Sequence, residues 1–105
     1  MTDALVVLVT APSAEAAAEL ARALVEARLA ACGNVVPGLR SIYRWEGRVT
    51  EDAEALLILK TTRAAFDALR AEVLRRHPYQ VPEVLALPVE AGSEPYLAWL
   101  AGQVG

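Results

Sequence analysis

Residues 37–61 constrain the fold more than any other stretch, because they predict a single long β-hairpin. Its turn is expected at Glu46-Gly47, since a two-residue loop ending in glycine supplies the positive φ of a primed hairpin turn. The return arm is apolar at all four positions from 56 to 59. Side chains alternate between the two faces of a strand, so both faces of this arm have to be covered.

The rest of the chain supplies two further strands, an extended run that leads into the hairpin, and three helices. Ser13 is expected to cap the first helix, Pro37-Gly38 to make a bulge or a bend, Thr62 to cap the second helix and Pro78 to stop it. In order, we expect a strand at 5–9, a helix at 13–28, a strand from 30, the hairpin, a helix at 62–77, a strand at 84–89 and a short helix from 92.

The order β-α-β-β-α-β predicts an α+β fold of the ferredoxin-like type, here with an extended central hairpin and a short C-terminal helix. In that arrangement both longer helices cover one face of a four-stranded sheet. The strands at 5–9 and 56–59 are apolar on both sides. We therefore expect another copy of the chain, or the terminal helix, to cover the open face, and the long hairpin is suited to reaching a neighbour. The sequence predicts a homo-oligomer.

The size and charge of the chain exclude several classes of function. A chain of 105 residues fits one domain, which we place at residues 1–105. Its net charge of −3 gives no electrostatic reason to bind nucleic acid or an anionic membrane. No apolar run reaches the roughly 18 residues of a membrane span, and no signal peptide is recognisable. The lone Cys32 excludes an intrachain disulfide, so we expect a cytoplasmic protein.

Standard catalytic motifs are absent from the chain. Its glycines are isolated, and none opens a helix at the spacing of a phosphate-binding loop. One histidine and one cysteine fix no nucleophile and base pair, so acyl transfer and proteolysis are not expected.

Metal binding is the more serious possibility. Cys32 and His77 carry thiolate and imidazole ligands suited to copper or zinc, and Glu54 or Glu83 can add oxygens. Ligand spacings such as C-x-x-C are missing, so a site has to be assembled by the fold or across subunits. The structural alternatives are a buried Cys32 that acts as a small hydrophobe and a His77 that ends a helix and packs on the sheet.

Lys60 is the only lysine and follows the apolar return arm. Desolvated there, it can form a Schiff base or bind an anion. The alternative is an ion pair with Glu54, Glu83 or Glu90. Five aromatic residues are expected either to ring a pocket or to anchor an interface: Tyr43, Trp45, Tyr79, Tyr96 and Trp99.

Taken together, several short motifs resemble the CutA divalent-cation tolerance family. They cover almost the whole chain, in the family's order and with matching gaps. The motifs are Ala31-Cys32, Pro37-Gly38, Ser41-Ile42-Tyr43-Arg44-Trp45-Glu46-Gly47, Leu59-Lys60-Thr61-Thr62, His77-Pro78-Tyr79-Gln80-Val81-Pro82-Glu83 and Tyr96-Leu97-Ala98-Trp99-Leu100.

The resemblance implies a ferredoxin-like subunit, similar to the nitrogen-regulatory PII proteins, in a stable trimer. It implies a cytoplasmic protein of divalent-cation tolerance, with copper or another divalent cation bound in some members. Cys32 matches the cysteine proposed as a copper ligand, and His77 and Glu83 complete the expected metal ligands. Motif positions expected to line a cleft near subunit contacts are Tyr43, Trp45, Lys60, His77, Tyr79 and Glu83. Further cysteines of other members are missing here, so a site of several thiolates needs several subunits.

Two rival functions follow from the same residues. One is a PII-like sensor whose intersubunit clefts bind a small anionic metabolite through Lys60 with Arg44 or Arg48. The other is an enzyme that uses Lys60 or His77. We expect neither rival but a trimeric, non-catalytic metal-response protein that binds divalent cations. The anion sensor is kept as the alternative.

Overall fold

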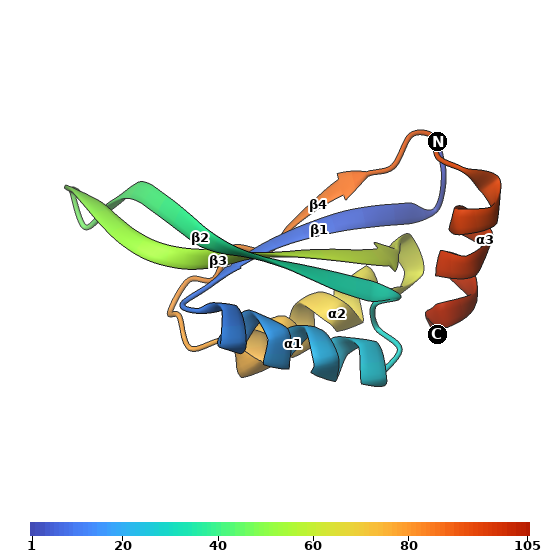
Figure 1. The fold of residues 1–105 in the computed structure, drawn as a ribbon, viewed down its shortest axis with the longest axis horizontal. Helices are drawn as coiled ribbons and strands as arrows, with labels where there is room; N and C mark the ends of the chain where they lie inside the picture. The colour runs from blue at the N-terminus through green and yellow to red at the C-terminus, as the bar shows by residue number, and fades with distance from the viewer.

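The computed structural model describes all of residues 1–105 as four strands and three helices. They are β1 (Ala4–Ala11), α1 (Ala14–Glu26), β2 (Cys32–Trp45), β3 (Arg48–Thr62), α2 (Arg63–Arg76), β4 (Leu85–Pro88) and α3 (Glu94–Gln103). One antiparallel sheet has the order β2-β3-β1-β4. Helices α1 and α2 cover one face of it, while α3 stands at the end opposite the hairpin tip (Figure 1). The predicted ferredoxin-like α+β fold is confirmed.

The hairpin of β2 and β3 forms where the sequence predicts it. Glu46 and Gly47 make the turn with φ of 50° and 78°, the left-handed pair of a primed turn. The pairing register shifts between Val36 and Leu39, and Gly38 between them has a φ of 78°. The predicted bulge is therefore confirmed, and the hairpin extends past the helical layer (Figure 1).

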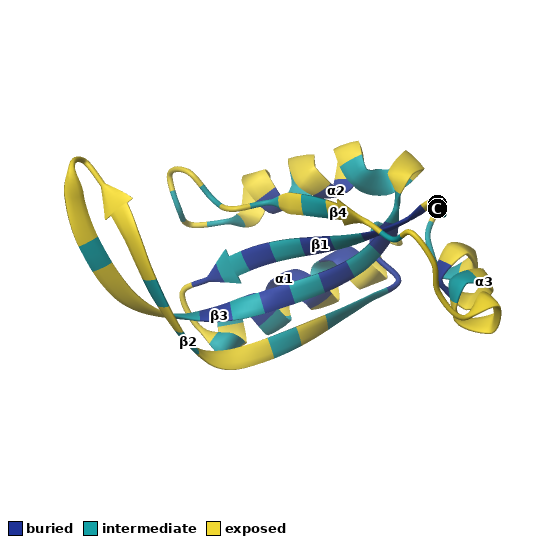
Figure 2. Ribbon diagram, turned by 90° about the horizontal axis from the view of Figure 1, so that it is seen from above, coloured by how far each residue is buried: buried dark blue, intermediate teal, exposed yellow.

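The core lies between the sheet and the helices α1 and α2. Alternate residues of the two central strands point into it, so β1 and β3 show the stripes of buried and half-buried residues seen in Figure 2. Its fully buried members include Val7, Leu57, Leu24 and Leu69. Gly33 of β2 faces the same layer, where an added Cβ would lie 2.9 Å from the Cβ of Ala21. A glycine is needed there because α1 lies too close to the strand for a side chain.

The other face of the sheet, which we call the open face, is mostly apolar. Cross-strand partners share a face, so the register identifies its members. They are Cys32, Asn34 and Val36 of β2, Leu56, Ile58 and Lys60 of β3, Val6, Leu8 and Thr10 of β1, and Leu85 and Leu87 of β4. Helix α3 covers only one end of this face, where its buried Leu100 packs beside Ala4 and Ala31 and its Tyr96 contacts Cys32.

One predicted element end is confirmed, and three others differ from expectation. Ser13 caps α1 by accepting a hydrogen bond from the Ala16 N–H at 3.0 Å, as predicted. The helix nevertheless ends at Glu26, because Arg28 has a φ of 61° that no α-helix contains. Thr62 occupies the N-cap position of α2 without a side-chain capping bond. Strand β4 spans four residues rather than the six expected at 84–89.

Candidate functional site

The predicted site residues fall into three separate regions of one chain. Cys32 and Lys60 lie at the end of the sheet next to α3. His77 lies where α2 ends, against the last residues of β1. The aromatic residues Tyr43, Trp45 and Tyr79, with Glu83, line a cavity beside the hairpin.

Cys32 and Lys60 are direct cross-strand partners on the open face. The half-buried thiol lies 3.6 Å from the hydroxyl of Tyr96 on α3, and this hydrogen bond raises the pKa of Tyr96. The Lys60 ammonium donates to the Oδ1 of Asn34. The ion pair expected for Lys60 with Glu54, Glu83 or Glu90 does not form. The ammonium group binds the amide oxygen on the neighbouring strand instead.

Both nitrogens of the His77 ring are occupied by the backbone. The Nε2 lies 2.7 Å from the carbonyl oxygen of Thr10, and the Tyr79 N–H donates to Nδ1 at 3.2 Å. A carbonyl oxygen can only accept and a backbone N–H can only donate, so Nε2 carries the proton and the Nδ1 lone pair is used. Held in this way, the ring has no free lone pair for a metal ion.

One chain does not bring Cys32, His77 and Glu83 together. Cys32 pairs with Lys60, and Lys60 with Val6 of β1. The His77 ring binds Thr10, which lies about 13 Å further along that strand at the usual rise per residue. No group of three or more His, Cys, Asp or Glu residues in the structure is arranged to hold a metal ion. A site that includes Cys32 therefore needs ligands from outside its own chain.

A cavity of about 550 Å³ opens between the hairpin and the connection from α2 to β4. We call it the hairpin pocket. It brings together five residues that the sequence analysis named, Tyr43, Trp45, Glu54, Tyr79 and Glu83, but excludes Lys60 and His77. It also contains Asp52, which the sequence did not single out. Its lining is Thr10, Ser41, Ile42, Tyr43, Trp45, Asp52, Glu54, Tyr79, Gln80, Val81 and Glu83. Asp52 lies two residues before Glu54, and that spacing puts both carboxylates on one face of a strand.

Two tyrosine hydroxyls hold the carboxylates of the hairpin pocket. The Tyr79 hydroxyl donates to Glu54 Oε2 at 2.6 Å, and the Tyr43 hydroxyl donates to Asp52 Oδ2. Burial, and then the hydrogen bond to Glu54, raises the pKa of Tyr79. The hydrogen bond to Asp52 raises the pKa of Tyr43. No lysine, arginine or histidine lines this pocket, so its charged groups are three carboxylates.

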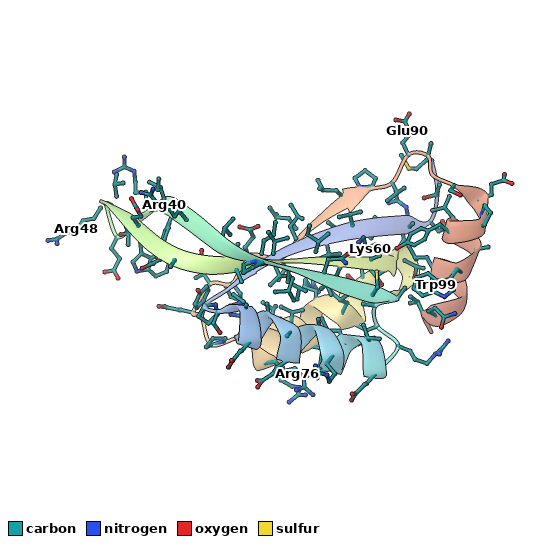
Figure 3. The ribbon with its side chains drawn as sticks, in the orientation of Figure 1. Arg40, Arg48, Lys60, Arg76, Glu90 and Trp99 are labelled. Carbon is teal, nitrogen blue, oxygen red and sulfur yellow. The ribbon has the colours of Figure 1, made fainter.

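The basic residues expected to bind an anion do not meet in one chain. Lys60 lies on the part of the sheet nearer α3, whereas Arg48 lies at the hairpin tip, so the two are far apart along the long axis in Figure 3. A second cavity, of about 430 Å³, contains Arg75 and Arg76 between α1 and the end of α2. Both guanidiniums there already bind the carboxylate of Glu72. Neither region presents an unpaired cluster of basic groups.

Comparison with known proteins identifies the family. Residues 5–103 match the family model described as CutA1 divalent ion tolerance protein. The chain belongs to the CutA1 family. The divalent-cation tolerance protein CutA of Thermus thermophilus is 57% identical over 100 residues, which are 95% of this chain and 97% of that protein.

Solved CutA1 structures share the fold. The T. thermophilus structure is 56% identical and superposes with a TM-score of 0.95, covering 97% of this chain and 99% of that chain. The Oryza sativa CutA1 structure is 48% identical with a TM-score of 0.94, covering 97% of this chain and 94% of that chain. The predicted family membership is therefore confirmed.

CutA1 relatives are named for more than one compartment. An Arabidopsis thaliana relative named chloroplastic is 50% identical over 91% of this chain, which spans 53% of that longer protein. A structure from Archaeoglobus fulgidus, described as periplasmic, is 36% identical with a TM-score of 0.94, covering 97% of this chain and 99% of that chain. In the present chain, every helix is too short or too polar to cross a membrane.

Proposed function

We propose that this CutA1-family protein is a non-catalytic homotrimer that binds copper or another divalent cation in the cytoplasm. The observation that carries the proposal is the position of Cys32. The lone thiol lies on an edge strand and on the open face, where a second copy of the chain can approach it. The cytoplasm fits a free thiol because that compartment is reducing.

The open face supports assembly. Leu85 and Leu87 of β4 are 56% and 49% exposed in the single chain, and Val36 on the opposite edge is 42% exposed. Apolar side chains spread over a whole sheet face are unfavourable in water and mark an interaction surface. The edges of β2 and β4 also have unpaired backbone groups that a neighbouring strand can bind.

The same assembly explains how one cysteine per chain can bind a metal ion. Copper and zinc are held by several ligands, and soft thiolates favour copper. His77 is committed to Thr10 and Tyr79, and Glu83 lines the hairpin pocket away from Cys32. Thiols from different copies are therefore the ligands that we propose, while His77 serves a structural role.

Light scattering tests the assembly. We expect the wild-type protein to have three times the 11.2 kDa mass of one chain. Ile58→Glu places a carboxylate in the middle of the open face and should reduce that mass. Val25→Glu, on the exposed side of α1, is the matched control and should leave it unchanged. A wild-type protein that scatters as a folded monomer contradicts the trimer.

Calorimetric titration with copper tests the metal site. We expect binding by the wild type, no comparable binding by Cys32→Ala, and unchanged binding by His77→Ala wherever that variant stays folded. Equal heats for the wild type and Cys32→Ala would remove Cys32 from the proposal. Zinc titrated into the same variants measures the preference for soft ligands.

A further inference from the structure

The hairpin pocket has a chemical character that divalent-metal binding does not explain. Its volume of about 550 Å³ lies in the range of small-molecule sites. A bare metal ion needs converging ligands rather than space, and the structure contains no such group of acidic, histidine or cysteine side chains. The pocket is therefore suited to an organic ligand.

The lining of the pocket indicates the charge of that ligand. Three rings, those of Tyr43, Trp45 and Tyr79, face the same cavity as the carboxylates of Asp52, Glu54 and Glu83. Aromatic faces attract cations, and carboxylates accept hydrogen bonds from ammonium groups. No basic side chain of the chain lines the pocket, so an anionic ligand would be repelled by three carboxylates without a cation to offset them.

Hydrogen bonding leaves the carboxylates able to accept more. Tyr43 donates to one oxygen of Asp52 and Tyr79 to one oxygen of Glu54, so each carboxylate is fixed in direction. Each keeps further lone pairs for a ligand, since an ionised carboxylate has about four acceptor positions. A ligand with several N–H donors suits this arrangement better than a quaternary ammonium ion, which has none.

The spacing of the two fixed carboxylates indicates the length of the ligand. Asp52 and Glu54 are two residues apart on β3, so they are separated by about 6.6 Å along the strand. An extended four-carbon chain with an ammonium group at each end spans a similar length. Its methylenes would lie against the rings of Tyr43 and Trp45.

We propose that the hairpin pocket binds a small aliphatic diamine in its doubly protonated form. Each ammonium group donates to one of the fixed carboxylates on β3, and Glu83 adds attraction from the opposite wall. This site goes beyond the metal-binding function, because its lining includes neither Cys32 nor any residue at the α3 end of the sheet.

Calorimetric titration with 1,4-diaminobutane tests the proposal on the whole protein. We expect saturable binding that weakens as salt is added, because exposed charges are screened. Butylamine, with one ammonium group, should bind more weakly, and neutral 1,4-butanediol and anionic succinate should not bind. No saturable binding of 1,4-diaminobutane at low salt would overturn the proposal, and so would equal binding of succinate.

Variants of β3 locate the site. Asp52→Asn and Glu54→Gln keep the shape of the side chain and should each weaken diamine binding about three- to tenfold. Glu51→Gln is the matched control, since Glu51 is the sequence neighbour of Asp52 but binds Arg40 on the other side of the strand. Equal weakening by Glu51→Gln, or none by either pocket variant, would overturn the site.

The proposals of a copper site at Cys32 and of a diamine site in the hairpin pocket can be refuted independently. Cys32→Ala should keep diamine binding intact, and Asp52→Asn should keep copper binding intact. A side chain of a second copy that fills the pocket would abolish diamine binding by the assembled protein, and this outcome counts against the proposal.

Discussion

The imidazole of His77 joins the end of α2 to the end of β1 through its 2.7 Å contact with the Thr10 carbonyl oxygen. The same ring accepts the N–H of Tyr79, whose own ring lies 4.5 Å away between centroids. Tyr79 in turn reaches Glu54 in the hairpin pocket. His77 thus fixes the connection that forms one wall of that pocket.

Replacing His77 with Phe should therefore cost stability rather than metal affinity. The variant keeps an aromatic ring beside Tyr79 but leaves a part-buried carbonyl and a backbone N–H without their partners. We expect a loss of about 1–3 kcal/mol in the free energy of unfolding, measured in urea. Arg70→Ala, an exposed position on the same helix, should change it by less than about 0.5 kcal/mol. Equal stability of His77→Phe and the wild type would contradict the structural role.

Gly33 allows the second prediction, because the backbone of β2 lies against α1 there. An alanine Cβ would lie 2.9 Å from the Cβ of Ala21 and 3.1 Å from a methyl carbon of Leu59. Gly33→Ala should destabilise the fold by about 1–3 kcal/mol, since overpacking shifts the backbone. Gly102→Ala on α3 has open space around it and should stabilise by about 0.5–1 kcal/mol. Thermal or urea unfolding of both variants checks the contrast, and a neutral Gly33→Ala would contradict the close approach.

The fold was predictable from the sequence because local patterns determine most of it. The apolar run at 56–59 requires cover on both faces of β3, and Glu46-Gly47 permits a primed turn. The end of α1 was missed because it depends on a long-range contact. Arg28 takes a positive φ while its guanidinium binds the carbonyl oxygens of Gly102 and Gly105, far along the chain.

The candidate site was only partly predictable, because it depends on register and on hydrogen bonds. Motif order placed Tyr43, Trp45 and Tyr79 near one another, and the hairpin pocket contains all three. No sequence pattern revealed that His77 uses both nitrogens for the backbone. Nor did any pattern reveal that Cys32 lies several residues away from Thr10 along the sheet, since that distance follows from the pairing of three strands.

Ionisation of Tyr79 should lower the free energy of unfolding at alkaline pH. Its pKa is raised in the folded state, by burial and by Glu54, above the value of about 10 expected when unfolded. The unfolded chain therefore loses this proton first, so the contribution is complete below pH 10 and falls as pH rises beyond it. Tyr79→Phe should show a shallower alkaline loss of stability and one fewer phenol in an ultraviolet titration. An unchanged slope above pH 10 would contradict a pKa of Tyr79 raised by burial and by Glu54.

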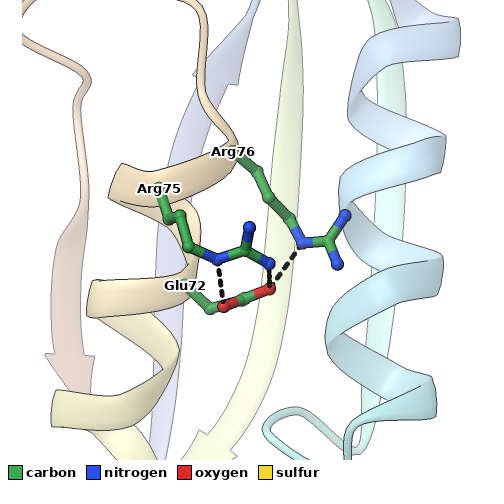
Figure 4. Close-up of polar contacts among 3 residues, drawn as sticks. All are labelled: Glu72, Arg75 and Arg76. Atoms are coloured by element: carbon green, nitrogen blue, oxygen red, sulfur yellow. Dashed lines mark hydrogen bonds and ion pairs between the residues drawn. The ribbon is translucent and has the colours of Figure 1, made fainter.

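Glu72 should have the opposite pH dependence, in acid. Its carboxylate accepts from Arg75 Nε at 3.0 Å and from Arg76 Nε at 2.6 Å (Figure 4). These hydrogen bonds lower its pKa from 4.5 to about 2. The unfolded chain then binds the proton at higher pH than the folded chain, so this stabilisation is present above pH 4.5 and is lost as pH falls towards 2. Melting temperatures of the wild type and Glu72→Gln should therefore converge across that window, and should converge with added salt as well, since the group is exposed to solvent. A constant difference between the two proteins down to pH 2 would show that Glu72 stabilises α2 by packing alone.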